Sequence, residues 1–136
     1  MGTEFTFYDF IDADNSGKNI ISDWLNNDGK NVKKHFNVMI RNLEASPPPG
    51  TQDTVWSAPY TWPLHEEWQG FLEIRKKVNH IQYRLICKME GREVFIVSWG
   101  YHKGNWETDV THRTAERRVM QMKHEPDKYR RKHDKR

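Results

Sequence analysis

Three runs of strand-forming residues within residues 62–103 constrain the fold of this chain more than any other feature. Each run is rich in β-branched and aromatic residues, and only a short polar segment, Asn79-His80 or Glu90-Gly91, separates one run from the next. Connections this short predict consecutive hairpins, so the three strands should be neighbours in an antiparallel sheet. The predicted strands cover residues 70–78, 81–89 and 93–99.

The part of the chain before residue 46 has a different pattern. Residues 6–11 alternate imperfectly between apolar and polar positions, which indicates a first strand, and residues 12–17 form the turn after it. Residues 20–25 have helical spacing. A second helix over residues 31–45 is clearer, because its apolar residues recur at i, i+4, i+7, i+8 and i+11 and form one stripe. These residues are Val32, Phe36, Met39, Ile40 and Leu43.

The predicted fold is α+β in the order β-α-α-β-β-β. Two helices pack on an antiparallel sheet, and a C-terminal helix and a basic tail follow. Residues 46–60, rich in Pro, Ser, Thr and Gly, form a long surface loop whose run Pro47-Pro48-Pro49-Gly50 ends the second helix. The last helix should extend from Thr114 to about Met122, with Thr111 or Thr114 as its cap, and Pro126 argues against its continuation. A chain of 136 residues is one domain by size, 1–136.

Positive charge is concentrated near the C-terminus. The whole chain has a net charge of +3, whereas residues 117–136 contain about nine Lys or Arg and about three acids, roughly +6. We interpret residues 117–136 as a basic C-terminal extension. Such a segment either attracts nucleic acid or an acidic partner, or is a solvated and disordered tail.

Cysteine content and hydropathy exclude several classes of protein. The single cysteine, Cys87, rules out an intramolecular disulfide and a multi-cysteine metal site, and it favours a reducing compartment. Its apolar neighbours favour a core residue over a nucleophile. No stretch has the apolar length that a membrane span needs, and the N-terminus is acidic where a signal peptide is basic. We therefore expect a soluble, cytoplasmic protein.

Two patterns suggest metal binding, and neither predicts a metal site. Residues 12–17 read Asp-x-Asp-x-Ser-Gly, like the first half of an EF-hand loop, but Asn19 takes the apolar eighth position and Asp23 the twelfth, where Glu is needed. A strand-to-helix turn explains the same residues. The seven histidines are scattered without tight ligand spacing. We expect neither a metal nor a cofactor.

The cations and the histidine on the predicted strands suit metal-free cleavage of RNA. In this reaction the ribose 2′-oxygen loses a proton as it attacks the phosphate, and the leaving 5′-oxygen gains one. Charge on the phosphoryl oxygens must also be stabilised. Arg75 and Arg84 can lie close together across an antiparallel pair, and Tyr101-His102 follows the third strand. From the spacing alone, two solvent-facing surface arginines are the simpler interpretation.

The order of these motifs resembles the RelE/ParE superfamily of toxin–antitoxin ribonucleases, and within it the HigB-like and phage-derived Gp49-like branch. The resemblance covers most of the chain. It rests on a Pro-Leu turn at residues 63–64, Glu-Ile-Arg at 73–75, Tyr-Arg at 83–84 and Gly-Tyr-His at 100–102. It implies a toxin of a type II toxin–antitoxin system that cleaves ribosome-bound mRNA without a metal. Its expected partners are mRNA, the ribosome and a cognate antitoxin protein, and no membrane.

The resemblance also implies roles for particular residues. Arg84 matches the arginine of the family's Tyr-Arg motif, and Arg75 corresponds to a basic position on the preceding strand. Tyr101 and His102 match the Tyr-His pair that closes HigB-like chains. These four residues form the expected catalytic set, with the arginines holding the phosphate and the pair transferring protons. The expected RNA contacts are Lys77, Lys103 and His65.

A second function stays open. The chain can instead be a non-catalytic ParE-like binder of a protein target such as gyrase, or a degenerate RNA-binding remnant. The Tyr101-His102 pair discriminates between these functions, because a ParE-like chain needs no proton-transferring pair at that place. Two positions depart from the HigB-like pattern: Gly100 replaces an acid, and Trp62 replaces a basic residue or His before Pro-Leu. His65 is the candidate substitute for the latter.

Overall fold

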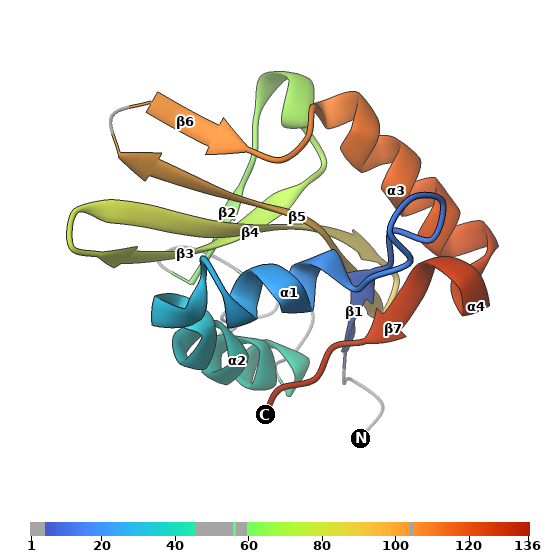
Figure 1. The fold of residues 1–136 in the computed structure, drawn as a ribbon, viewed down its shortest axis with the longest axis horizontal. Coiled ribbons are helices and arrows are strands. Elements are labelled where there is room, and N and C mark those ends of the chain that lie inside the picture. The colour runs from blue at the N-terminus through green and yellow to red at the C-terminus, as the bar shows by residue number, and fades with distance from the viewer. Residues whose placement is uncertain (1–4, 46–55, 57–59, 104) are drawn as a thin grey trace.

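The structure is a computed structural model that describes residues 5–45, 56, 60–103 and 105–136. Within this part of the chain, seven strands form one open mixed sheet in the order β2-β3-β4-β5-β1-β7, and β6 pairs with β5 (Figure 1). The predicted α+β class is confirmed. The elements are β1 Thr6–Phe10, α1 Ile20–Asn26, α2 Lys30–Glu44, β2 Thr61–Pro63, a 3₁₀ turn Glu66–Trp68, β3 Leu72–Val78, β4 Ile81–Glu90, β5 Glu93–Lys103, β6 Asn105–Thr108, α3 His112–His124, α4 Pro126–Tyr129 and β7 Arg130–Lys132.

Strand β1 corrects the prediction of a wholly antiparallel sheet. It pairs in parallel with β5, in a register that runs from Thr6 opposite Glu93 to Asp9 opposite Ile96. Helices α1 and α2 and strands β2, β3 and β4 lie between β1 and β5 in the chain. A connection of that length lets two strands run in the same direction, whereas a short hairpin forces them antiparallel.

The two hairpins confirm the predicted centre of the sheet. The turn between β3 and β4 uses Asn79 and His80, which have φ values of 50° and 68°. Positive φ at both central residues is typical of the turn that matches the twist of a two-residue hairpin. The hairpin between β4 and β5 turns at Gly91, whose φ is 63°. Strand β5 extends to Lys103, beyond the predicted end at residue 99, because β6 pairs with its last four residues.

Helices α1 and α2 cover one face of the sheet. The side chain of Asn19 caps α1 by accepting a hydrogen bond from the Ser22 backbone N–H at 2.9 Å. The predicted stripe of α2 is buried at four positions, and Met39 is half-buried beside them. Residues 46–50, predicted to end this helix, and most of the predicted 46–60 loop lie outside the described residues. The four buried α2 side chains are Val32, Phe36, Ile40 and Leu43.

Helix α3 covers part of the opposite face. Thr111, one of the two caps that the sequence predicted, caps it, since its hydroxyl accepts a hydrogen bond from the Thr114 backbone N–H at 3.3 Å. The buried side of α3 packs against Phe95 and Val97 of β5. The helix ends before Pro126, but this proline then occupies the first turn of the short helix α4. Proline is well tolerated there because that N–H needs no helical partner.

Residues 117–136 are integrated into the fold, so their interpretation as a solvated, disordered tail is wrong. Strand β7 pairs antiparallel with β1. After β7, the backbone N–H of His133 donates to the Phe7 carbonyl at 2.9 Å, and the His133 side chain is only 4% exposed. Its ring lies between Asp9 of β1 and Asn37 of α2 at 2.7 and 2.8 Å. The C-terminal segment thus contributes to the core.

Candidate functional site

Two arginines lie directly opposite each other on β3 and β4. Arg75 is the register partner of Arg84, and Arg84 is the register partner of Gly100 on β5. Directly opposed residues of antiparallel strands project to the same face, with Cβ atoms about 4.5–5.5 Å apart. The predicted proximity of the two arginines is therefore a consequence of the hairpin register.

A buried carboxylate holds this arginine pair. Glu73 is 1% exposed; its Oε1 lies 2.5 Å from Nε of Arg75, and its Oε2 lies 3.5 Å from Nε of Arg84. Arg75 also stacks over the ring of Trp62 at 4.3 Å. The arginine side chains remain 33% and 22% exposed. Burial lowers the pKa of Arg84 and Glu73 counteracts this, so the guanidinium stays charged near neutral pH.

A second row of polar residues lies two positions further along the same strands. Lys77 is the register partner of Gln82, and Gln82 is the register partner of His102. Because side chains alternate along a strand, this row shares a face with the arginine row. Diagonal neighbours on one face are about 7–8 Å apart, within reach of one phosphodiester group. We call Arg75, Lys77, Arg84 and His102 the cationic face.

Tyr101 lies on the opposite face of the sheet, which separates it from His102. It pairs in register with Tyr83 and lines a hollow of about 280 Å³ with Trp24 and Asp28 on the side of α1. A hydrogen bond with Glu107 raises its pKa, so its hydroxyl keeps its proton. The sequence prediction placed both residues at a corner after the strand. The structure continues β5 through them, and the alternation of a strand then splits the pair.

The two other predicted RNA contacts differ in their surroundings from Lys77. His65 is exposed in the segment between β2 and the 3₁₀ turn, beyond the β2 end that pairs with Leu72. This end of β3 is the one away from Lys77, so His65 does not join the cationic face. Lys103 is the last residue of β5 and pairs in register with Asn105.

The sequence analysis missed a histidine that borders the cationic face. His35 of α2 lines a hollow of about 350 Å³ together with Arg75, Lys77 and Gln82. Burial and the charge of Lys76 lower the pKa of His35, while its hydrogen bond to the Arg75 backbone opposes this shift. No sequence signal links His35 to this place, because packing of α2 on the sheet brings it there.

Glu73 was also missed, although the sequence contains a signal for it. Residues 73 and 75 are two apart on a predicted strand and therefore share a face. Glu73 lies two residues before Arg75 on β3, and Arg75 is directly opposite Arg84 on β4. Its carboxylate can therefore bind both guanidinium groups on this face.

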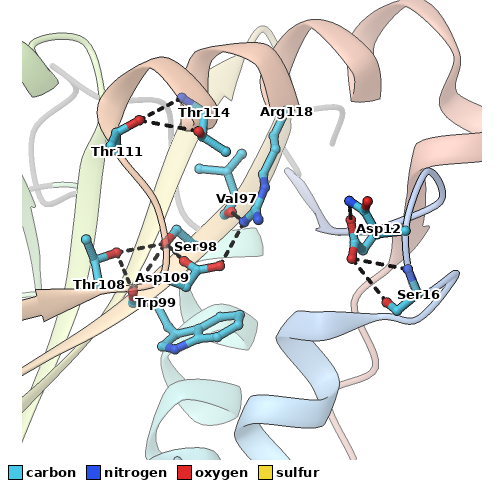
Figure 2. A network of polar contacts seen from close by, with 11 residues as sticks. Asp12, Ser16, Val97, Ser98, Trp99, Thr108, Asp109, Thr111, Thr114 and Arg118 are labelled. Carbon is cyan, nitrogen blue, oxygen red and sulfur yellow. Dashed lines mark hydrogen bonds and ion pairs between the residues drawn. The ribbon is translucent and has the colours of Figure 1, made fainter.

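A network of hydrogen bonds connects α3 to β5 and β6 (Figure 2). The Ser98 hydroxyl lies 3.0 Å from that of Thr108 and donates to Asp109. Arg118 of α3 donates to the Val97 carbonyl at 2.7 Å and to Asp109 at 3.1 Å. Because Ser98 is fully buried, we assign it to positioning β5 and β6, and not to nucleophilic attack.

The loop that resembles half of an EF-hand is a hydrogen-bonded turn. Burial would raise the pKa of Asp12, but hydrogen bonds from Asn15 and Ser16 outweigh it, so the pKa is lowered (Figure 2). Asp14 accepts a hydrogen bond from the Tyr129 hydroxyl at 2.8 Å. Across the described residues, no group of three or more His, Cys, Asp or Glu side chains is arranged to hold a metal ion.

Comparison with known proteins adds no identification. No protein family, curated protein or solved structure matches this chain. Within the described part of the chain, no helix has the length and apolar character needed to cross a membrane.

Proposed function

We propose that this protein is a metal-independent endoribonuclease that uses the cationic face to bind and cleave RNA. The observation that carries the proposal is the anchored pair Arg75 and Arg84, with Lys77 and His102 in the next row of the same face. In Figure 1, the turn between β3 and β4 and the C-terminal end of β5 lie at the side of the sheet away from α3. Two guanidinium groups side by side suit the non-bridging oxygens of one phosphodiester.

In the proposed reaction, the 2′-oxygen of the ribose attacks the adjacent phosphorus and the bond to the 5′-oxygen breaks. Arg75 and Arg84 stabilise the charge that develops on the phosphoryl oxygens. His102 transfers a proton at this centre. The products carry a 2′,3′-cyclic phosphate, or a 3′-phosphate after its hydrolysis, on one end and a 5′-hydroxyl on the other.

The second proton-transfer group of this proposal is His35 in place of Tyr101. Tyr101 faces α1, and its raised pKa keeps the hydroxyl protonated at neutral pH, so it is not available to accept the proton of the 2′-oxygen. His35 lines the same hollow as Arg75, and its lowered pKa keeps the ring neutral at pH 7 and ready to accept a proton. His35 reaches the edge of β3 from the α2 side of the sheet, where it shares a hollow with Arg75 and Lys77, and His102 lies on the cationic face itself.

We further propose that the protein is a RelE-like toxin of a type II toxin–antitoxin system. The order β1-α1-α2, then the strands β3-β4-β5, then α3 supports this proposal. In it, the substrate is ribosome-bound mRNA in the cytoplasm, and a cognate antitoxin covers the cationic face. A solved structure of a relative would test this assignment by showing whether its first strand also pairs in parallel with the strand that corresponds to β5.

The decisive experiment is induced expression of the protein in growing cells. Wild type should arrest growth and shorten mRNA in a translation-dependent way, leaving 2′,3′-cyclic or 3′-phosphate ends. His102→Ala and Arg84→Ala should relieve the arrest, since loss of one proton-transfer or charge-stabilising group removes a factor of about 10² to 10⁴ in rate.

Matched controls are His80→Asn in the exposed hairpin turn and Arg113→Ala on the exposed side of α3. Both should remain as toxic as wild type. If folded wild type leaves message intact on active ribosomes, or if His102→Ala and Arg84→Ala remain fully toxic, the nuclease proposal is wrong.

A second candidate function is favoured by the position of Tyr101. Tyr101 and His102 lie on opposite faces of the sheet, so they do not form one proton-transferring pair. Such a pair was the feature that favoured a nuclease over a ParE-like protein binder. In this alternative, or in that of a degenerate RNA-binding remnant, growth arrest occurs with intact mRNA. His102→Ala would then keep its toxicity, whereas Arg84→Ala would lose it by weakening the interface.

A further inference from the structure

A second basic surface lies between α2 and the C-terminal segment. Two adjoining hollows of about 300 and 390 Å³ share Arg41 and Lys135. Seven Lys or Arg side chains line them, whereas Glu44 is the one acid among the described lining residues. We call this surface the α2 groove. Its main cations are Lys30, Lys33, Lys34 and Arg41 of α2 with Lys132 and Lys135 of the C-terminal segment.

The helical repeat explains how the groove is separated from the cationic face. At 100° per residue, the α2 cations fall on one flank of the buried stripe, and His35 and Met39 fall on the other. His35 and Met39 line the hollow beside Arg75. The α2 groove therefore lies across the helix from the proposed nuclease site. From Lys30 to Arg41 its cations extend along about 16 Å of helix.

The buried network beneath β7 builds the other wall of the groove. His133 is anchored to Asp9 and Asn37, which holds Lys132 and Lys135 on either side of it in place. Arg41 also donates a hydrogen bond to the Lys135 carbonyl. These cations are thus part of an ordered surface.

Among the described residues, few acids balance the positive charge of the groove, and the charge that they leave unbalanced opposes stability. Lys135 pairs with Glu44 at 2.6 Å, and Arg136 pairs with Asp134 at 3.0 Å. The first turn of α2 contains no acid. Acidic residues stabilise a helix N-terminus and cations weaken it, so lysines at residues 30, 33 and 34 are unfavourable for the isolated fold. A negatively charged partner removes this repulsion.

We propose that the α2 groove binds the phosphate backbone of a folded, double-stranded stretch of RNA. In double-stranded DNA each strand presents a phosphate about every 3.4 Å of axis. The phosphates of an A-form RNA duplex are spaced more closely along the axis, so the cations of α2 can face at least about four phosphates of one strand. An acidic protein segment needs apolar anchors as well as charge. Among the described lining residues, Val38 is the one large exposed apolar side chain, at 44%.

This inference does not depend on RNA cleavage at the cationic face. A short single strand in that site cannot also follow the groove across α2. A partner that contacts both surfaces must present phosphates on two sides of the protein, as a folded RNA does. The binding should be insensitive to sequence, because backbone contacts carry no base information.

The test is binding of wild-type protein to a mixed-sequence RNA duplex of about 20 base pairs across a salt series. The triple variant Lys30→Gln, Lys33→Gln, Lys34→Gln should bind at least tenfold more weakly at low salt. Its slope of log affinity against log salt should fall by up to about three units, near one per lysine. Its urea midpoint should not fall, since it removes cations from a helix N-terminus.

A matched control removes three exposed cations elsewhere: Lys18→Gln, Arg113→Gln, Lys123→Gln. It should bind as wild type does. The comparison of the two triple variants measures binding and not cleavage, and neither variant changes a residue of the cationic face, which separates this inference from the nuclease proposal. The inference is overturned if the two triple variants bind alike, or if wild type binds polyglutamate more tightly than the duplex at the same salt.

Discussion

Asp9 and Glu73 are two carboxylates with the same burial and different surroundings. Each residue is 1% exposed. Asp9 bonds to the rings and amides of buried or half-buried neighbours, with His133 at 2.7 Å and Asn19 at 2.9 Å. Glu73 instead binds two arginines that reach solvent.

The difference separates a structural role from a functional one. The partners of Asp9 are Asn19, just before α1, and His133 in the C-terminal segment, and His133 in turn binds Asn37 of α2. This network therefore ties β1, α2 and the C-terminal segment together. The partners of Glu73 come from one hairpin that the backbone already forms. Glu73 is therefore not needed to build the hairpin, and its effect is to hold two cations close together at the surface.

The largest expected effect is on stability, from His133→Ala. Loss of the ring leaves Asp9 buried without its main partner, and breaking a buried pair costs about 3–5 kcal/mol. The free energy of unfolding, measured by urea denaturation, should fall by that amount. His124→Ala, in the exposed last turn of α3, should change it by less than about 0.5 kcal/mol. A His133→Ala protein as stable as wild type would show that the C-terminal segment is dispensable.

The next effect is on RNA cleavage, from Glu73→Gln. The arginines lose the charge that holds them, and misplacement of a catalytic group by about 1 Å can reduce a rate by 10²-fold. We expect the single-turnover rate to fall by about 10- to 100-fold, with a smaller loss of stability than for His133→Ala. If Glu73→Gln unfolds the protein as His133→Ala does, the two carboxylates have the same role.

A smaller effect is expected in the pH dependence of stability. The pKa of His35 is lowered from 6.5, so protonation favours the unfolded chain. Stability should fall as the pH decreases below 6.5, and this loss is complete once the pH is below the folded-state pKa. His35→Gln should therefore lose less stability than wild type between about pH 7.5 and about pH 5. His80→Gln is the control, since this exposed ring should leave the profile unchanged.

The smallest effect is expected from Tyr101→Phe. The hydroxyl lies on the face opposite the cationic face, so its removal should change the cleavage rate by less than about threefold and stability by about 0.5 kcal/mol or less. The rate of His102→Ala should be measured in parallel. A loss of about 10²-fold in Tyr101→Phe would return this residue to the catalytic set.

The sequence contained enough information for several features that depend on local chemistry. The apolar stripe of α2 predicted its buried side chains, Thr111 predicted the start of α3, and Asn79-His80 predicted the first hairpin. The opposition of Arg75 and Arg84 followed from that hairpin, because a short turn sets the register of the strands on either side. Glu73 was within reach of the same reasoning.

Other features depend on contacts between residues far apart in the chain. Strand β1 takes its direction from β5, which is more than thirty residues away in the chain. His133 is buried against Asp9, which is also distant in the chain. The extension of β5 through Tyr101 depends on pairing with β6, a strand without a clear sequence pattern of its own. Because β5 continues through Tyr101 and His102, and because successive side chains along a strand alternate, the two residues lie on opposite faces of the sheet. The composition of residues 117–136 indicates charge, but pairing with β1 and α2 orders this segment, and those contacts form only when the whole chain folds.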